Sequence, residues 1–226
     1  MSDLFFTRFQ MNPRRRATLH LLASPQRLHA AVLSAYPPDV QAGADGGRLL
    51  WRLDSPSRHE LNLYVVGAGR PSLEQLYEEC GWGGQQSWRT AAYTPFLARL
   101  EEGQQWVFRL TANPTRSVAS KRGSRGAVSA HVTAEQQLSW LLQRQRRHGF
   151  EVVSRDDEPQ VRVSRRERET FSKRAGGGGA RVTLTRVQYD GVLRVTDPDV
   201  LRTSLTHGIG RAKAYGCGLM TLARAQ

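Results

Sequence analysis

The chain has 226 residues, enough for one large domain or for two domains of about 100 residues each. Its 33 Lys and Arg against 20 Asp and Glu give a net charge of +13, which favours a polyanionic partner, most simply nucleic acid. Two cysteines exclude a disulfide framework, and the lack of an export signal or long apolar run predicts a cytoplasmic protein with no membrane span.

The basic residues fall into three separate regions. No Asp or Glu occurs between Asp3 and Asp39, or between Glu102 and Glu135, although both stretches contain several arginines. A third basic cluster covers residues 162–186. Three regions far apart in the sequence predict a positively charged surface rather than one charged tail.

The first half of the chain begins with alternating polar and apolar residues at 7–11, which predict a strand that ends at Asn12-Pro13. Ser24 is a suitable N-cap and Pro25 suits the first position of a helix that Pro37 ends. The remaining pattern predicts strands at 49–53 and 61–66, a helix at 72–79 and a last strand within 88–97.

The second half repeats this order. A strand at 108–112 ends at Asn113-Pro114, as the first strand ends at its own Asn-Pro pair. Thr133 and Gln136 form a capping-box pattern for a helix that Gly149 stops. The sequence then predicts strands at 150–153, 161–171 and 182–195, a helix from Asp197 to the glycine at 208, and a short final strand.

Each half therefore has the order strand-helix-strand-strand-helix-strand, which is the ferredoxin-like plan. The predicted fold class is α+β, with two tandem ferredoxin-like (RRM-like) domains at residues 1–102 and 103–226. The second domain adds a basic β-hairpin at 162–186, whose tip holds four consecutive glycines at 176–179, and a C-terminal glycine-rich loop.

The glycine-rich loop covers residues 208–218 and holds Gly208, Gly210, Gly216 and Gly218. Glycine allows a ligand to approach the backbone closely, and the cationic Arg211 and Lys213 indicate that this ligand is anionic. The alternative is a flexible turn before the last strand. The loop is not a P-loop, because no Gly-Lys-Ser/Thr sequence ends it.

His29 is the most interesting of the six histidines. It lies one residue after the core-facing Leu28, so it is turned by about 100° toward the edge of the helix. The acid-free surroundings are expected to lower its pKa and keep it neutral enough to act as a base. The alternative is an ordinary surface histidine.

The other histidines have simpler interpretations. His148 precedes a helix-ending glycine, where its charge would interact favourably with the helix dipole. His207 precedes the first glycine of the glycine-rich loop and has the same helix-end interpretation. Thr133, in the triplet His131-Val132-Thr133, is interpreted as a helix cap. No cluster of Cys, His and carboxylates indicates a metal or another cofactor. Neither half shows the aromatic pattern of sequence-reading RRM domains, so RNA binding would depend on basic faces and loops.

Four segments, in order, resemble the CasE-type CRISPR repeat-processing endoribonucleases, the subunit that matures crRNA in type I-E Cascade. The resemblance covers nearly the whole chain. Its segments are residues 6–9 with Asn12-Pro13, Ser24-Pro25-x-x-Leu28-His29, residues 108–114, and the glycine-rich loop with Leu219-Met220.

The resemblance implies metal-independent cleavage of precursor CRISPR RNA at the 3′ base of each repeat stem-loop, by attack of the 2′-hydroxyl. The enzyme is expected to be monomeric when free, to stay on the mature crRNA hairpin and to join the other Cascade subunits. His29 is the implied catalytic residue. The residues expected to bind RNA are Arg27, Arg165, Arg166, Arg168, Lys173, Arg174, Arg181, Gly208, Gly210, Arg211, Lys213, Gly216 and Gly218.

One position departs from the family pattern. Relatives often carry a tyrosine one helical turn before the histidine as a second catalytic group, and this chain has Gln26 there. Arg27 or Lys213 would then stabilise the phosphorane. The departure keeps open a non-catalytic subunit of the same complex that binds the RNA hairpin. A general basic RNA-binding protein is a third possibility, which explains the charge but not the glycine motif.

Overall fold

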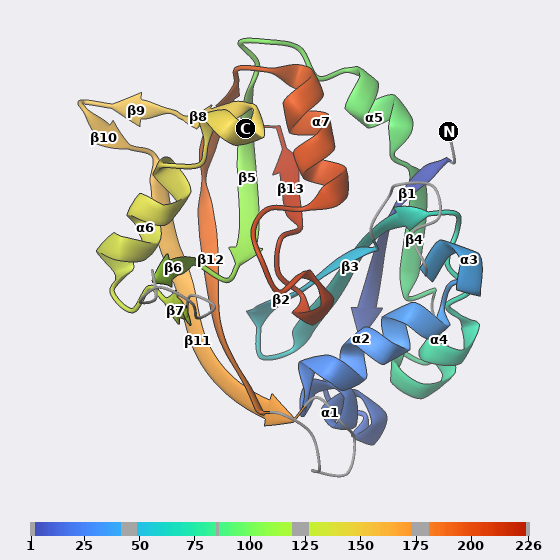
Figure 1. The fold of residues 1–226 in the computed structure, drawn as a ribbon. Helices are drawn as coiled ribbons and strands as arrows, with labels where there is room; N and C mark the ends of the chain where they lie inside the picture. The colour runs from blue at the N-terminus through green and yellow to red at the C-terminus, as the bar shows by residue number, and fades with distance from the viewer. Residues whose placement is uncertain (1–2, 42–48, 85, 119–126, 173–180, 225–226) are drawn as a thin grey trace.

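The computed structural model describes residues 3–41, 49–84, 86–118, 127–172 and 181–224. Its strands form two main antiparallel sheets, one from each half of the chain (Figure 1). Among the described residues, no helix is long and apolar enough to cross a membrane.

The first sheet has the strand order β2-β3-β1-β4. Helices α1 to α4 cover one face, where Leu28 and Val32 of α2 pack with Phe9 of β1 and Leu63 of β3, whereas Leu97 of α5 is buried in the other core, with residues of the second half. The strands are β1 (Leu4–Met11), β2 (Leu50–Ser57), β3 (Glu60–Ala68) and β4 (Trp88–Ala92). The helices are α1 (Arg16–Leu22), α2 (Pro25–Ser34), α3 (Pro38–Gln41), α4 (Glu74–Cys80) and α5 (Thr94–Ala98).

The second sheet has the order β11-β12-β5-β13, and β8 also pairs with β12. Trp140 of α6 and Leu205 of α7 are buried with Leu110 and Tyr189 of the sheet. The main strands are β5 (Gln105–Ala112), β8 (Phe150–Val152), β11 (Val161–Ser172), β12 (Arg181–Val195) and β13 (Met220–Ala223). The helices are α6 (Ala134–Leu142), η1 (Arg146–His148), α7 (Pro198–His207) and η2 (Lys213–Tyr215). Two small hairpins are formed by β6 (Thr115–Val118) with β7 (Ala127–Ala130), and by β9 (Ser154–Arg155) with β10 (Glu158–Pro159).

Both sheets have the ferredoxin-like order, with β1 beside β3 at the centre of the first sheet and β5 beside β12 at the centre of the second, where the hairpin adds β11. The predicted fold class is therefore confirmed. The division at residues 102 and 103 stays a prediction, although the two main sheets draw on residues 4–92 and 105–223 respectively. The basic hairpin forms as β11 and β12, and it extends from its own sheet toward α1 and α2 of the other half (Figure 1).

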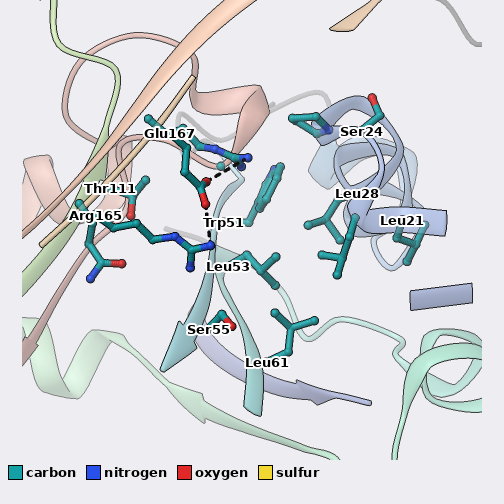
Figure 2. A pocket seen from close by; sticks show the side chains of 15 residues that line it. Leu21, Ser24, Leu28, Trp51, Leu53, Ser55, Leu61, Thr111, Arg165 and Glu167 are labelled. Atoms are coloured by element: carbon teal, nitrogen blue, oxygen red, sulfur yellow. Dashed lines mark ion pairs between the residues drawn. The ribbon is translucent and has the colours of Figure 1, made fainter. Parts of the chain in front are cut away.

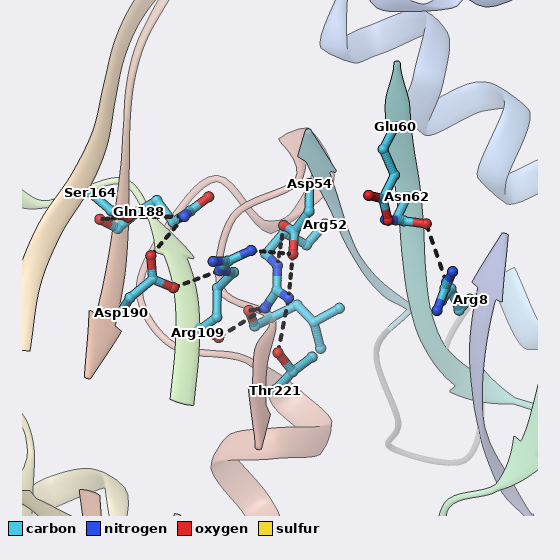
Figure 3. Close-up of polar contacts among 11 residues, drawn as sticks. Arg8, Arg52, Asp54, Glu60, Asn62, Arg109, Ser164, Gln188, Asp190 and Thr221 are labelled. Carbon is cyan, nitrogen blue, oxygen red and sulfur yellow. Dashed lines mark hydrogen bonds and ion pairs between the residues drawn. The ribbon is translucent and has the colours of Figure 1, made fainter. Parts of the chain in front are cut away.

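A buried arginine joins the two halves. Arg52 of β2 binds both carboxylate oxygens of Asp54 at 2.7 and 2.9 Å. It also donates to the carbonyl oxygens of Arg109 and Leu219 and to the hydroxyl of Thr221, all in the second half (Figure 3). These contacts use all five guanidinium N–H groups, so the buried charge is fully hydrogen-bonded.

The same polar network continues into the second sheet. Arg109 donates to Asp54 at 3.3 Å and to Asp190 at 2.5 Å, and Gln188 donates to the other oxygen of Asp190 (Figure 3). Two carboxylates and two guanidinium groups therefore alternate from β2 to β12. This chain of ion pairs fixes how the two sheets face each other.

Several elements were not expected from the sequence, among them α1, α3, α5 and the β6–β7 hairpin. The helix α1 begins at Arg16 after two further arginines and has no side-chain cap, but Thr18 on its inner face is buried. The hairpin β6–β7 follows Pro114 in a stretch that has little apolar periodicity. The helix predicted from Thr133 to Gly149 is shorter, since α6 ends at Leu142. Gly149, with φ 77°, instead ends the separate short helix η1. The last strand of the first half ends at Ala92, because Pro95 suits the first turn of α5.

Candidate nucleic-acid interface

His29 lies on α2 and contacts a buried tryptophan. Its Nδ1 atom accepts a hydrogen bond of 3.4 Å from Nε1–H of Trp51, which is fully buried in β2. The bond places the ring proton of the neutral histidine on Nε2, since Nδ1 is the acceptor. Nε2 is thus the ring nitrogen that remains for a bound molecule.

Burial lowers the pKa of His29, because the half-buried imidazolium loses hydration. The direction agrees with the expectation from the sequence, but the cause is burial rather than the surplus of neighbouring arginines. The elements packed against α2 include α1 and η2 besides the strands of the first sheet, and the titratable side chains of α1 and η2 are Arg16, His20, Lys213 and Tyr215. With its proton on Nε2, the neutral ring can donate a hydrogen bond there but has no Nε2 lone pair to accept a proton.

The glycine-rich loop packs against the first half of the chain. Gly216 has φ 76°, and a Cβ atom there would lie 2.6 Å from Cζ3 of Trp51. Gly208 has φ 77°, and a Cβ atom there would lie 2.8 Å from a methyl group of Leu50. These two buried glycines are therefore required for close packing between the halves. Gly218 is also buried, whereas Gly210 is exposed.

The cationic residues of the loop lie nearer the surface. Arg211 is exposed and its backbone bridges to Asn113, at the end of β5. Lys213 is partly exposed in η2, which packs against α2. On α2 itself, Arg27 is exposed and donates to the carbonyl oxygen of His20, while Gln26 is half-buried. The loop and the helix that carries His29 are thus direct neighbours, as the RNA site predicted from the sequence requires.

The hairpin arginines lie on two different faces. Side chains alternate along a strand, so Arg166 and Arg168 of β11 share a face with Arg181 of β12. The same alternation puts Arg165 on the opposite face, where it forms an ion pair of 2.6 Å with Glu167, and a bulge between Val163 and Arg165 shifts the pairing register just before it. All four arginines are exposed. Lys173, Arg174 and the glycines of the hairpin tip lie outside the described residues.

A cavity of about 260 Å³ lies between the hairpin and the first half of the chain. Leu28, Leu53 and Trp51 line one side, and Arg165 and Glu167 line the other (Figure 2). The N-terminus of α2 and Gly216 of the glycine-rich loop also contribute to its wall. The cavity therefore joins α2, the hairpin and the loop at one place.

The prediction for His148 was wrong. Burial lowers its pKa, and the neighbouring Arg147, Arg144 and Lys213 lower it further. Its Nδ1 lies 2.9 Å from the hydroxyl of Ser204 on α7. The positive form of His148 is therefore disfavoured at this helix end, because burial removes its hydration and cationic side chains lie nearby.

Thr133 caps α6 with a complete capping box, as predicted. Within the described ranges, no group of three or more His, Cys, Asp or Glu side chains has an arrangement that could hold a metal ion.

Reasoning from the sequence missed two residues at this site. Trp51 and Arg52 are consecutive on β2 and point to opposite faces of the sheet, one toward His29 and the other toward the second half. A charged residue in an otherwise apolar strand, followed two positions later by Asp54, is the pattern that indicates a buried ion pair.

Comparison with known proteins identifies the family. The family described as "CRISPR associated protein" matches residues 4–224. The CRISPR-associated endoribonuclease Cse3 of Thermus thermophilus is 30% identical over 227 residues, covering 97% of this chain and 100% of that protein. The CRISPR system Cascade subunit CasE of Escherichia coli (strain K12) is 31% identical over 132 residues, covering 55% of this chain and 61% of that protein.

A solved structure is also similar over the full length. Thermus thermophilus Cse3 bound to an RNA that represents a pre-cleavage complex has a TM-score of 0.79 and 27% identity, and the match covers 98% of this chain and 100% of that one. The resemblance to CasE-type proteins is thereby confirmed. With a family match from residue 4 to residue 224 and a relative matched along its entire length, the chain belongs to the CRISPR-associated protein family.

Proposed function

We propose that the chain is an endoribonuclease that cleaves precursor CRISPR RNA at the 3′ base of the repeat stem-loop and stays bound to the mature crRNA hairpin. The observation that carries this proposal is the position of His29, half-buried beside the glycine-rich loop and hydrogen-bonded through Nδ1 by Trp51. Relatives that are named as endoribonucleases and have been solved with RNA support it.

The proposed reaction needs no metal. The 2′-oxygen of the ribose attacks the adjacent phosphorus, the bond from phosphorus to the 5′-oxygen breaks, and the products carry a cyclic phosphate and a 5′-hydroxyl. One proton leaves the 2′-hydroxyl and one reaches the departing 5′-oxygen. His29 is proposed to act on the departing 5′-oxygen, toward which its Nε2–H can donate, because the Trp51 bond at Nδ1 leaves the ring proton on Nε2 and no lone pair there to accept the 2′-hydroxyl proton.

The phosphate must also be held while its negative charge grows. The cationic residues proposed for this role are Arg27 on α2 and Arg211 and Lys213 of the glycine-rich loop, because both elements adjoin His29. The arginines proposed to bind the hairpin backbone are Arg165, Arg166, Arg168 and Arg181, together with Lys173 and Arg174. Gly208, Gly210, Gly216 and Gly218 are proposed to shape the loop against the RNA.

The proposed partners, besides repeat RNA, are the other Cascade subunits. The name of the Escherichia coli relative supports this assembly. The free protein is proposed to be a monomer that needs no cofactor.

The test is cleavage of a matching repeat hairpin in excess EDTA. The wild-type protein is expected to cut it, and His29→Ala is expected to bind it with unchanged affinity but not to cut. The matched control is His20→Ala, which removes an exposed histidine of α1 and should leave cleavage unchanged. Undiminished cleavage by His29→Ala would overturn the assignment of His29.

A second function is favoured by one observation. Gln26 occupies the position of the family's second catalytic group, and glutamine cannot transfer a proton. The chain would then be a non-catalytic subunit that binds the RNA hairpin in the same complex. Tight binding of the repeat hairpin by the wild type without any cleavage is the result that would favour this function.

A further inference from the structure

The cavity between the hairpin and the first half has two chemically different sides. Leu21, Leu22, Leu28, Leu53 and Leu61 provide an apolar side. The opposite side is polar, with Arg165, Glu167, Arg186 and Gln188 from β11 and β12 (Figure 2). An occupant that fits both sides must be apolar on its face and polar along its edge.

The charges of the cavity disfavour a phosphate group inside it, although Arg165 is half exposed and can contact the RNA backbone outside. Glu167 lies 2.6 Å from Arg165, and Arg186 is paired with Glu169 at 2.6 Å and with Glu167 at 3.7 Å, so carboxylates already balance both arginines. A phosphate would have to displace the Glu167 carboxylate and would lie against five leucines. The occupant is therefore neutral.

The polar side offers both kinds of hydrogen-bonding group. The Glu167 carboxylate and Oε1 of Gln188 accept, while the Arg165 guanidinium donates; the N–H groups of the Gln188 amide are already bound to Ser164 and Asp190. A planar ring with donors and acceptors along one edge satisfies such a wall, and a nucleobase has that structure.

The size of the cavity is consistent with one ring system. Pockets for drug-sized ligands usually have volumes of about 300–1,000 Å³, and this one has about 260 Å³. A single base removed from its stack is smaller than such ligands. Two stacked bases or a whole nucleotide pair would not fit.

The cavity also lies next to the proposed catalytic residue. Leu28 lines it and precedes His29 in α2, and Trp51 lines it and donates to the His29 ring. A base held here is therefore attached to a ribose near Nε2 of His29. Taken together, these contacts lead us to infer that the cavity between the β11–β12 hairpin and the α2 helix binds one unstacked nucleobase of the RNA, adjacent to the cleaved bond.

This inference rests on the proposed function, because it requires a bound RNA. It adds a contact that reads one base, whereas the proposed backbone contacts read charge alone. Holding that base would fix the ribose whose 2′-oxygen attacks or the nucleotide that departs.

The experiment is an abasic scan measured by binding. Repeat hairpins that lack the base at one unpaired nucleotide flanking the stem are titrated against His29→Ala protein, so that no RNA is cut. One abasic position is expected to weaken binding about 5- to 150-fold, the range measured when one stacked base loses its partner. Loss of binding at no position would overturn the inference.

Variants of the cavity then locate the effect. In Leu53→Ser and in Glu167→Gln, each added to His29→Ala, the intact and the abasic RNA should bind with similar affinity. The matched control is Leu19→Ser, at a leucine of α1 that is 56% exposed and outside the cavity, and it should keep the full difference. Glu167→Gln preserves the side-chain shape, so it serves if Leu53→Ser fails to fold.

The outcomes separate the inference from the proposed function. A full abasic effect that persists in both cavity variants would place the base elsewhere and overturn the inference alone. Wild-type protein that binds but never cleaves would contradict the proposed cleavage and leave the base site standing. A protein that binds no repeat RNA would overturn both.

Discussion

Arg52 is the residue whose replacement should most disturb the junction of the two halves. Its side chain is 2% exposed and that of Asp54 is 5% exposed, so water can compensate neither charge. In Arg52→Met, the Asp54 carboxylate keeps, among the described side chains, the contact of 3.3 Å with Arg109, and Thr221 and two backbone carbonyl oxygens lose a donor. A buried charge would remain almost unpaired.

Removal of one partner from a buried ion pair costs about 3–5 kcal/mol. Natural domains have a free energy of unfolding of about 5–15 kcal/mol, so the loss would be a large part of the total. With an m-value of about 1–3 kcal/mol per molar urea, the midpoint of urea unfolding should fall by roughly 1–5 M. Tryptophan fluorescence measures this transition.

Two controls test the physical reason. Arg58→Met removes an exposed arginine of the adjacent turn, whose side chain donates to the neighbouring His59, and should change the free energy by less than about 0.5 kcal/mol. The double variant Arg52→Met/Asp54→Leu removes both charges and should be more stable than Arg52→Met alone. A midpoint for Arg52→Met within experimental error of the wild type would refute the reasoning, as would a double variant less stable than the single one.

Three further predictions concern the neighbourhood of His29. Trp51→Phe removes the donor that opposes a proton on Nδ1, so the pKa of His29 should rise by about 0.4–1 in an NMR titration; an unchanged pKa would contradict the bond. Gly216→Ala puts a methyl group 2.6 Å from the Trp51 ring at φ 76°, whereas Gly103→Ala has a similar φ of 83° and open space. Gly216→Ala should therefore lose roughly 1–3 kcal/mol more in urea unfolding, and equal losses would show that the contact is unimportant. The pKa values of His29 and His148 are lowered in the folded state, so below about pH 6.5 the unfolded state binds more protons. Replacing both histidines with glutamine should reduce the loss of unfolding free energy as the pH falls from about 7.5 to 5.5. Above that range the pH dependence of the unfolding free energy should be the same as in the wild type.

Features that depend on neighbours in the chain were predictable from the sequence. The strands that end at Asn12 and Asn113, the capping box of α6 and the helix after Ser24 all follow from local backbone preferences. The order of these elements was enough to predict two ferredoxin-like domains and a basic hairpin. It also placed His29 near the start of a helix.

The tertiary structure decided the surroundings of those residues. His29 receives its hydrogen bond from a residue 22 positions away, and Arg52 reaches a carbonyl 167 positions away. A bulge between Val163 and Arg165 shifts the register in which β11 pairs with β12. No local pattern encodes which side chains meet across the two sheets, because that pairing depends on how both halves pack.

The same distinction applies to the glycine-rich loop. Its sequence indicated backbone freedom and close approach, and glycines with positive φ at 208, 210, 216 and 218 agree with that. What approaches most closely at Gly208 and Gly216 is the first half of the chain, through Leu50 and Trp51. The sequence by itself left open a loop that approaches an anion and a flexible turn, and only the fold could show that two of its glycines pack against the first half, because a missing Cβ leaves room without specifying its occupant.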